Sequence, residues 1–114
     1  MDKIKKYESI ILELLKEYAA IQPANMSEYE NQIIVDSERH HYQSDSLGWN
    51  KKGHYIYVIN FHFDIKPTGK IWLMANNTDA LIAHELVKRG VPPTDIVLGF
   101  QAPNVRQYTE YAAA

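Results

Sequence analysis

The fold is decided by the stretch His54–Ile65, which has the sequence HYIYVINFHFDI. Successive side chains of a β-strand point to opposite faces. Strict alternation gives one face only large apolar or aromatic side chains: Tyr55, Tyr57, Ile59, Phe61, Phe63 and Ile65. The other face starts apolar and becomes polar toward His62 and Asp64. A helix would scatter both sets, so the pattern predicts the central strand of an antiparallel sheet whose aromatic face is covered by helices.

Short turns border this strand on both sides. Residues 48–53 begin and end with glycine and contain asparagine, a composition typical of a hairpin loop. Residues 66–69, Lys-Pro-Thr-Gly, form a second turn before a predicted strand at 70–75. We interpret residues 32–47 as one bent strand; the alternative is two strands around a turn at Asp36–Arg39. Sequential strands with short connections predict an antiparallel meander.

The N-terminal part predicts a helix that covers the sheet. Apolar residues within 3–21 recur at steps of three and four, which places them on one helical face. Pro23 should end this helix. Residues 24–31 are polar, and we expect them to form a connection to the first strand.

The C-terminal part predicts shorter helices. Residues 76–78, Asn-Asn-Thr, supply N-cap candidates for a helix over 79–89, and Gly90 is a natural residue to end it. Residues 93–100 fit either a helical turn or a short strand. Pro103 can begin a last short helix.

The composition favours one folded domain spanning residues 1–114. The chain is 46% hydrophobic, which indicates a packed core. A net charge of −2 gives no global basic field, which argues against a binder held to nucleic acid by phosphate neutralisation alone. The chain has no cysteine, so disulfides and thiolate chemistry are excluded. The start of the chain leads into a charged helix, and no apolar run could span a bilayer, so we expect a soluble cytoplasmic protein.

The histidines raise the question of a metal site. Under strict alternation Asn60, His62 and Asp64 share a strand face, and a His/Asp pair at this spacing could hold a metal if a neighbouring strand supplied further ligands. The neighbours considered are Glu38 with His40, or Arg39 with His41. We favour a solvated polar sheet face over this interpretation and therefore predict no metal ligand. No nucleophile motif or glycine-rich phosphate loop is present, and we predict no catalytic residue and no cofactor.

Basic and aromatic residues suggest two kinds of interaction surface. A DNA-binding patch could use residues near the hairpin ends: Arg39, Lys51, Lys52, Lys66 and Lys70. Tryptophan and tyrosine are favoured at protein interfaces, and the chain has two tryptophans and eight tyrosines. The predicted protein-recognition surface consists of Arg39, His41, Trp49 and Trp72. Solvated hairpin tips and completion of the core are the alternative interpretations.

Several stretches together resemble the XisI family, cyanobacterial proteins named fdxN element excision controlling factors. These stretches are Val35–Gln43 with Gly48-Trp49, Gly69–Trp72, Gly90–Phe100 and Pro103–Ala112. The resemblance implies a helper in site-specific DNA excision during heterocyst differentiation. It also implies a companion protein, XisH, and a separate recombinase that performs strand exchange. No catalytic or metal residue is carried over with it.

These observations predict a single α+β domain, an antiparallel β-meander packed with an N-terminal helix and C-terminal helices. The first functional hypothesis is a non-enzymatic accessory factor that binds an XisH-like protein and, through it, a recombinase complex and its DNA. The alternatives are a direct DNA-binding module and a metal-dependent enzyme at Asn60, His62 and Asp64. An exposed sheet edge could also pair two copies into a homodimer.

Overall fold

Five strands form one sheet in which each strand lies beside its sequence neighbours, in the order β1-β2-β3-β4-β5. The computed structural model describes residues 2–21 and 26–114. Its elements are α1 (Lys3–Ala19), β1 (Met26–Asp36), β2 (His41–Asn50), β3 (Tyr55–Ile65), β4 (Ile71–Asn76), α2 (Ile82–Lys88), a 3₁₀ turn (Pro93–Asp95), β5 (Ile96–Leu98) and α3 (Pro103–Arg106). Strands β1 to β4 pair antiparallel, and β5 pairs parallel to β4. The predicted α+β class with an antiparallel meander is confirmed.

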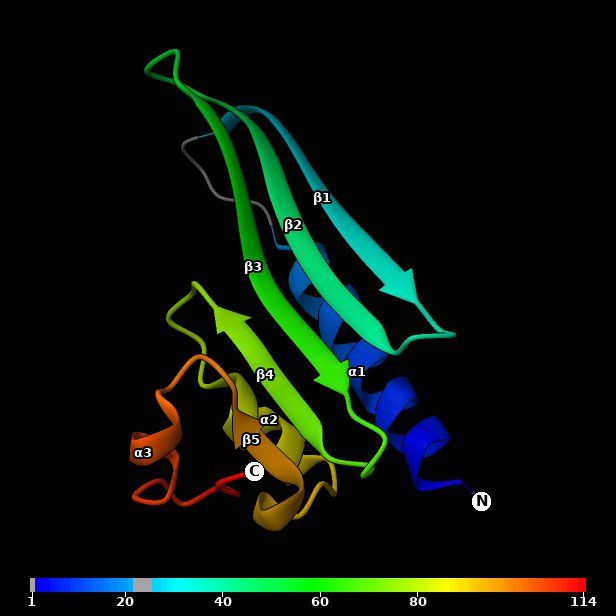
Figure 1. Cartoon of the computed structure of the whole chain (residues 1–114). Helices are drawn as coiled ribbons and strands as arrows, with labels where there is room; N and C mark the ends of the chain where they lie inside the picture. The colour runs from blue at the N-terminus through cyan, green and yellow to red at the C-terminus, as the bar shows by residue number, and fades with distance from the viewer. Residues whose placement is uncertain (1, 22–25) are drawn as a thin grey trace.

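Helices α1 and α2 cover one face of the sheet (Figure 1). Helix α1 begins where the Asp2 side chain accepts a hydrogen bond from the Ile4 amide at 3.0 Å. The buried stripe of α1 consists of Tyr7, Ile11, Leu14 and Leu15. This stripe packs on fully buried residues of the sheet, including Tyr42, Phe61 and Phe63. Burial of these large side chains is the main source of stability in a domain of this size. None of the helices in the described ranges is long and apolar enough to cross a membrane.

The prediction of one bent strand over residues 32–47 is wrong, and the two-strand alternative is right. Strand β1 ends at Asp36, and β2 begins at His41. The Asp36 carboxylate accepts hydrogen bonds from the backbone amides of Glu38 and Arg39 at 3.1 and 3.0 Å. The backbone of His40 takes a left-handed conformation with φ 62°. These features close a tight turn that weak hydrophobic alternation could not reveal.

The predicted polar connection over residues 24–31 is also wrong where the structure describes it, because β1 already begins at Met26. As an edge strand, β1 can carry polar residues on its exposed face. Asn31 also donates hydrogen bonds to the carbonyls of Ala19 and Ile21, which ties the strand to the end of α1. Pro23 and residues 24–25 lie outside the described residues.

A β-bulge at Asn60 switches the faces of β3. Ser44 pairs with Phe61 while the next residue, Asp45, pairs with Ile59, so Asn60 has no partner position on β2. Tyr55, Tyr57 and Ile59 therefore point away from the helices, with exposures of 52, 57 and 36%, whereas Phe61 and Phe63 are 1 and 0% exposed. The prediction that all six alternate residues are buried holds only after the bulge. Asparagine is depleted in strands, and that was the available signal.

Helix α2 is shorter than predicted. It begins at Ile82, not at residue 79, because the N-cap candidates close a turn instead: Asn76 accepts the Thr78 amide at 3.0 Å and donates to the Ala80 carbonyl at 2.8 Å. The predicted end is confirmed. Gly90 has φ 105°, its amide bonds to the Val87 carbonyl, and the Val91 amide bonds to the Leu86 carbonyl. This pair of bonds is a Schellman motif, which favours glycine.

The two interpretations of residues 93–100 are each right for part of the segment. A 3₁₀ turn over Pro93–Asp95 leads directly into the three-residue strand β5. The last short helix, α3, begins at Pro103 as expected.

Asp95 joins this turn to α1, and its ionisation should contribute to stability. Its carboxylate accepts a hydrogen bond from the Tyr7 hydroxyl. Its Oδ2 also forms an ion pair with Lys3 Nζ at 3.1 Å. Burial raises the pKa of Asp95, but the hydrogen bonds from Tyr7 and Lys3 and nearby lysine charges outweigh it and leave the pKa below its usual value. The unfolded state, with a pKa of about 3.9, then binds the proton more tightly than the folded state.

We therefore expect an Asp95-dependent stability that is complete above about pH 5 and is lost as the pH falls through 3.9 toward the lowered folded pKa. Asp95→Asn should lose about 1 kcal/mol or less at pH 7, since Lys3 is half exposed, and should show a flatter pH dependence than the unmodified chain. Urea unfolding between pH 3 and 7 measures both curves. Parallel curves would contradict the assigned role.

Candidate functional site

The face of the sheet opposite α1 and α2, here called the outer face, carries two distinct groups of side chains. The strand register defines it, because directly paired residues project to the same side. At one end, His41 pairs with Asp64, which pairs in turn with Trp72. At the other end, Leu47 pairs with Tyr57, and Trp49 pairs with Tyr55. The first group is polar and charged, and the second is apolar.

The polar group centres on His41, His62 and Asp64, here called the histidine–aspartate cluster. His41 Nδ1 lies 2.7 Å and His62 Nε2 lies 2.9 Å from the same atom, Asp64 Oδ1. The side chains of His41, His62 and Asp64 are 51, 30 and 10% exposed. The carboxylate is thus largely withdrawn from water, while His41 reaches the surface.

The electrostatic environment keeps Asp64 ionised. Burial raises the pKa of this carboxyl, but hydrogen bonds from His41 and His62 and their charges outweigh it, so the pKa lies below its usual value. Lys66 Nζ lies 3.6 Å from the second oxygen, Oδ2. The cluster therefore presents an anionic oxygen with two imidazole nitrogens aimed at it.

Two cations lie close to the Trp72 ring, next to the cluster. The Lys66 Nζ is 5.6 Å and the Arg106 guanidinium carbon is 4.9 Å from the ring centroid. Arg106 Nη2 also donates to the Gly99 carbonyl at 3.2 Å. The C-terminal segment is thereby held against β4, and Trp72 is half-buried. Arg106 was not foreseen because nothing in the sequence around α3 indicates that it returns to β4.

The apolar group consists of Trp49, Tyr55, Tyr57 and Ile59, here called the aromatic strip. All four side chains are at least one-third exposed, and the ring centroids of Trp49 and Tyr55 lie 5.3 Å apart. The strip lies on the arm that β2 and β3 extend beyond the helices, toward the turn between the two strands in Figure 1. Only Trp49 of this strip was among the predicted recognition residues.

The four predicted recognition residues do not form a single patch. Arg39, in the turn before β2, pairs with Asp36 at 3.1 Å and lies next to His41 in the chain. His41 and Trp72 flank Asp64 on neighbouring strands. Trp49 lies eight residues along β2 from His41, about 26 Å away at roughly 3.3 Å per residue. The structure thus brings together the residues at one end and leaves Trp49 in the aromatic strip.

The basic residues considered for DNA binding are also separated. Lys51 and Lys52 occupy the turn before β3, whereas Lys66 and Lys70 border the turn after it. These turns lie at opposite ends of a strand of 11 residues, about 36 Å long. The four lysines therefore do not form a single basic patch.

The metal hypothesis needs a correction in its ligand set. Because of the bulge, Asn60 turns to the helix-covered face, where its Nδ2 donates to Ser46 Oγ at 2.6 Å. Asn60 therefore cannot join His62 and Asp64. His41 takes its place from the neighbouring strand, while Arg39 is engaged with Asp36 and His40 lies 3.0 Å from the Tyr42 hydroxyl.

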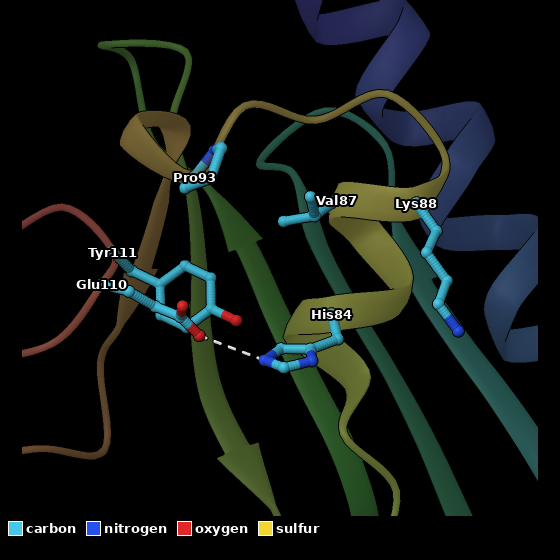
Figure 2. A pocket seen from close by; sticks show the side chains of 6 residues that line it. All are labelled: His84, Val87, Lys88, Pro93, Glu110 and Tyr111. Atoms are coloured by element: carbon cyan, nitrogen blue, oxygen red, sulfur yellow. Dashed lines mark hydrogen bonds and ion pairs between the residues drawn. The ribbon is translucent and has the colours of Figure 1, made fainter.

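A hollow between α2 and the C-terminal segment offers little chemistry. Figure 2 shows His84 on α2 facing Glu110, with Tyr111 beside them and the Lys88 side chain directed away. His84 Nε2 and Glu110 Oε1 are 3.1 Å apart, but both side chains are more than half exposed. Such a solvated pair contributes little to stability and does not form an enclosed site.

Comparison with known proteins assigns the chain to a family. The model of the XisI protein family matches residues 1–113. The chain belongs to the XisI family. Two solved structures from Anabaena variabilis ATCC 29413 resemble this XisI-family chain over 99% of its length and 100% of theirs. One, a XisI-like protein, is 47% identical with a TM-score of 0.84. The other, the fdxN element excision controlling factor XisI, is 33% identical with a TM-score of 0.81. No functionally curated protein matches this chain.

Proposed function

We propose that this XisI-family chain is a non-enzymatic accessory factor that controls site-specific DNA excision by binding a protein partner. The expected partner is an XisH-like protein, with strand exchange performed by a separate recombinase acting on DNA such as the fdxN element in differentiating heterocysts. The chain itself then contacts DNA only indirectly. The support from comparison is the similarity to a protein named as an excision controlling factor.

The aromatic strip is the observation that supports partner binding. Monomeric proteins rarely expose large contiguous apolar patches without an interaction that covers them. Trp49, Tyr55 and Tyr57 can bury large areas with little loss of rotamer entropy, as residues that dominate binding energy often do. Glu28 pairs with Trp49 in the sheet and Glu30 pairs with Leu47, so acidic side chains border the strip. We expect the partner surface to be apolar at its centre with basic residues on its rim.

The test is co-purification of the tagged chain with the XisH-like protein of the same genome. The double variant Tyr55→Ala/Tyr57→Ala should weaken the complex about tenfold or more, because the loss of two buried aromatic contacts exceeds 1.4 kcal/mol. Tyr108→Ala is the matched control, since Tyr108 is an exposed tyrosine on the C-terminal segment and not on the aromatic strip.

Two outcomes would contradict the proposal. If the folded wild-type chain does not co-purify with the XisH-like protein, the partner is wrong. If the isolated chain cleaves DNA when a divalent metal is added, the non-enzymatic role is wrong. A complex that the double variant and the Tyr108 control weaken equally would move the interface away from the aromatic strip.

A further inference from the structure

We infer that the histidine–aspartate cluster on the outer face is a binding site for a divalent transition metal of the Zn²⁺ class. The ligands are His41 Nδ1, His62 Nε2 and Asp64 Oδ1. The cluster lies at the opposite end of the outer face from the aromatic strip, so metal binding there is independent of the proposed partner interaction.

The convergence of the two imidazoles is the first argument. Both nitrogens point at one oxygen, Asp64 Oδ1, and the three ligand atoms lie within 4.8 Å of one another. Ligand atoms about 2.0–2.1 Å from a tetrahedral zinc ion lie roughly 3.3 Å apart. Small side-chain rotations therefore suffice to open the shared hydrogen bonds and admit an ion.

The rigidity of the frame is the second argument. His41 and Asp64 are direct partners in the β2–β3 ladder, and His62 lies on the same face two residues before Asp64. The carboxylate is largely buried, and all three residues belong to the paired strands β2 and β3. Sites built on strands hold their ligands more reproducibly than sites on loops.

The chemistry of the donor set selects the class of ion. Two imidazoles and one carboxylate suit Zn²⁺ and related transition metals, whereas Mg²⁺ and Ca²⁺ prefer oxygen ligands. His41 is half exposed, so a fourth position on the solvent side is open to water or to a donor from another molecule. Metal binding requires both ligating nitrogens to be free of protons, with each proton on the other ring nitrogen.

Lys66 is the feature that opposes cation binding. Its ammonium lies 3.6 Å from Asp64 Oδ2, on the oxygen that is not a ligand, and near the Trp72 ring. The positive charge does not block the ligand positions, but it repels a divalent ion. Removing this charge should therefore increase the affinity for the metal, so a Lys66 variant can test the site by a gain in affinity rather than a loss.

The experiment titrates ZnCl₂ into the full-length chain after removal of metals with a chelator, with heat measured by calorimetry. We expect one Zn²⁺ per chain. His62→Ala and Asp64→Asn should weaken binding by about 100-fold. His54→Ala, which removes an exposed histidine from the hairpin turn, should leave the affinity unchanged, and Lys66→Met should strengthen it severalfold. Circular dichroism confirms that each variant is folded.

Co²⁺ provides a second readout, because its absorption spectrum reports the coordination of the bound ion. Co²⁺ in a four-coordinate site with nitrogen and oxygen ligands gives intense visible absorption bands, and these bands should be lost in His62→Ala and kept in His54→Ala. Failure of the folded wild-type chain to bind Zn²⁺ would overturn the inference. Equal binding by His62→Ala and His54→Ala would also overturn it.

Discussion

Phe63→Ala should destabilise this XisI-family chain by about 3–5 kcal/mol, the range for deleting a fully buried phenylalanine side chain. Phe63 is 0% exposed and lies beside Phe61, with ring centroids 6.4 Å apart. A domain of this size has a total stability of roughly 5–15 kcal/mol, so the variant should be close to unfolding. Urea unfolding monitored by circular dichroism measures the difference.

Tyr57→Ala is the matched control for this prediction. Under strict alternation Tyr57 would share the buried face with Phe63, but the bulge at Asn60 places it on the outer face. We expect a change within about 1 kcal/mol for Tyr57→Ala, as for other exposed positions. Similar losses in the two variants would show that β3 alternates without a switch and would contradict the register described here.

Gly48→Ala should cost about 3 kcal/mol or more, because both space and backbone conformation exclude a side chain there. A Cβ at Gly48 would lie 1.9 Å from the Glu28 carbonyl oxygen, and φ is 148°. The backbone of β1 would have to move away from β2 to admit it. The measurement is the midpoint of urea or thermal unfolding relative to the unmodified chain.

Gly53→Ala separates the effect of space from that of conformation. Gly53 also has a positive φ of 82°, but a Cβ there meets nothing within 4 Å. The variant should lose only about 1 kcal/mol of stability, the cost of holding alanine in a left-handed conformation. If Gly53→Ala is as damaging as Gly48→Ala, the close approach of β1 to β2 is not the cause.

Much of the fold can be predicted from patterns of residues that are close together in the sequence. The helical stripe of α1, the turns around β3 and the Schellman end of α2 at Gly90 each depend on residues within a few positions. The turn residues at Asp36–Arg39 indicate the division into two strands only as an alternative. One bent strand is favoured because the edge strand β1, with one solvated face, has few apolar residues. Its register is set by β2 rather than by its own alternation.

The candidate site depended on a feature that periodicity hides. One unpaired residue, Asn60, places Tyr55 and Tyr57 on the outer face, and Asp64 lies opposite His41, with His62 two residues before it. Strict strand alternation placed Asn60 on the same face as His62 and Asp64 and placed Tyr55 and Tyr57 in the core. Both placements were wrong because the bulge at Asn60 interrupts the alternation. His41 could be named as a neighbour from sequence, but its pairing with Asp64 required the strand register.

The face switch at Asn60 separates two kinds of evolutionary constraint along a single strand. Phe61 and Phe63, after the bulge, must fit the packed interior against α1, whereas Tyr55 and Tyr57, before it, are exposed on the outer face. Substitutions in the arm can therefore change what the molecule recognises while the interior stays intact. Loss or gain of one residue in the arm strand has a different consequence, since it would exchange the two faces of the arm and turn Tyr55 and Tyr57 away from the outer face.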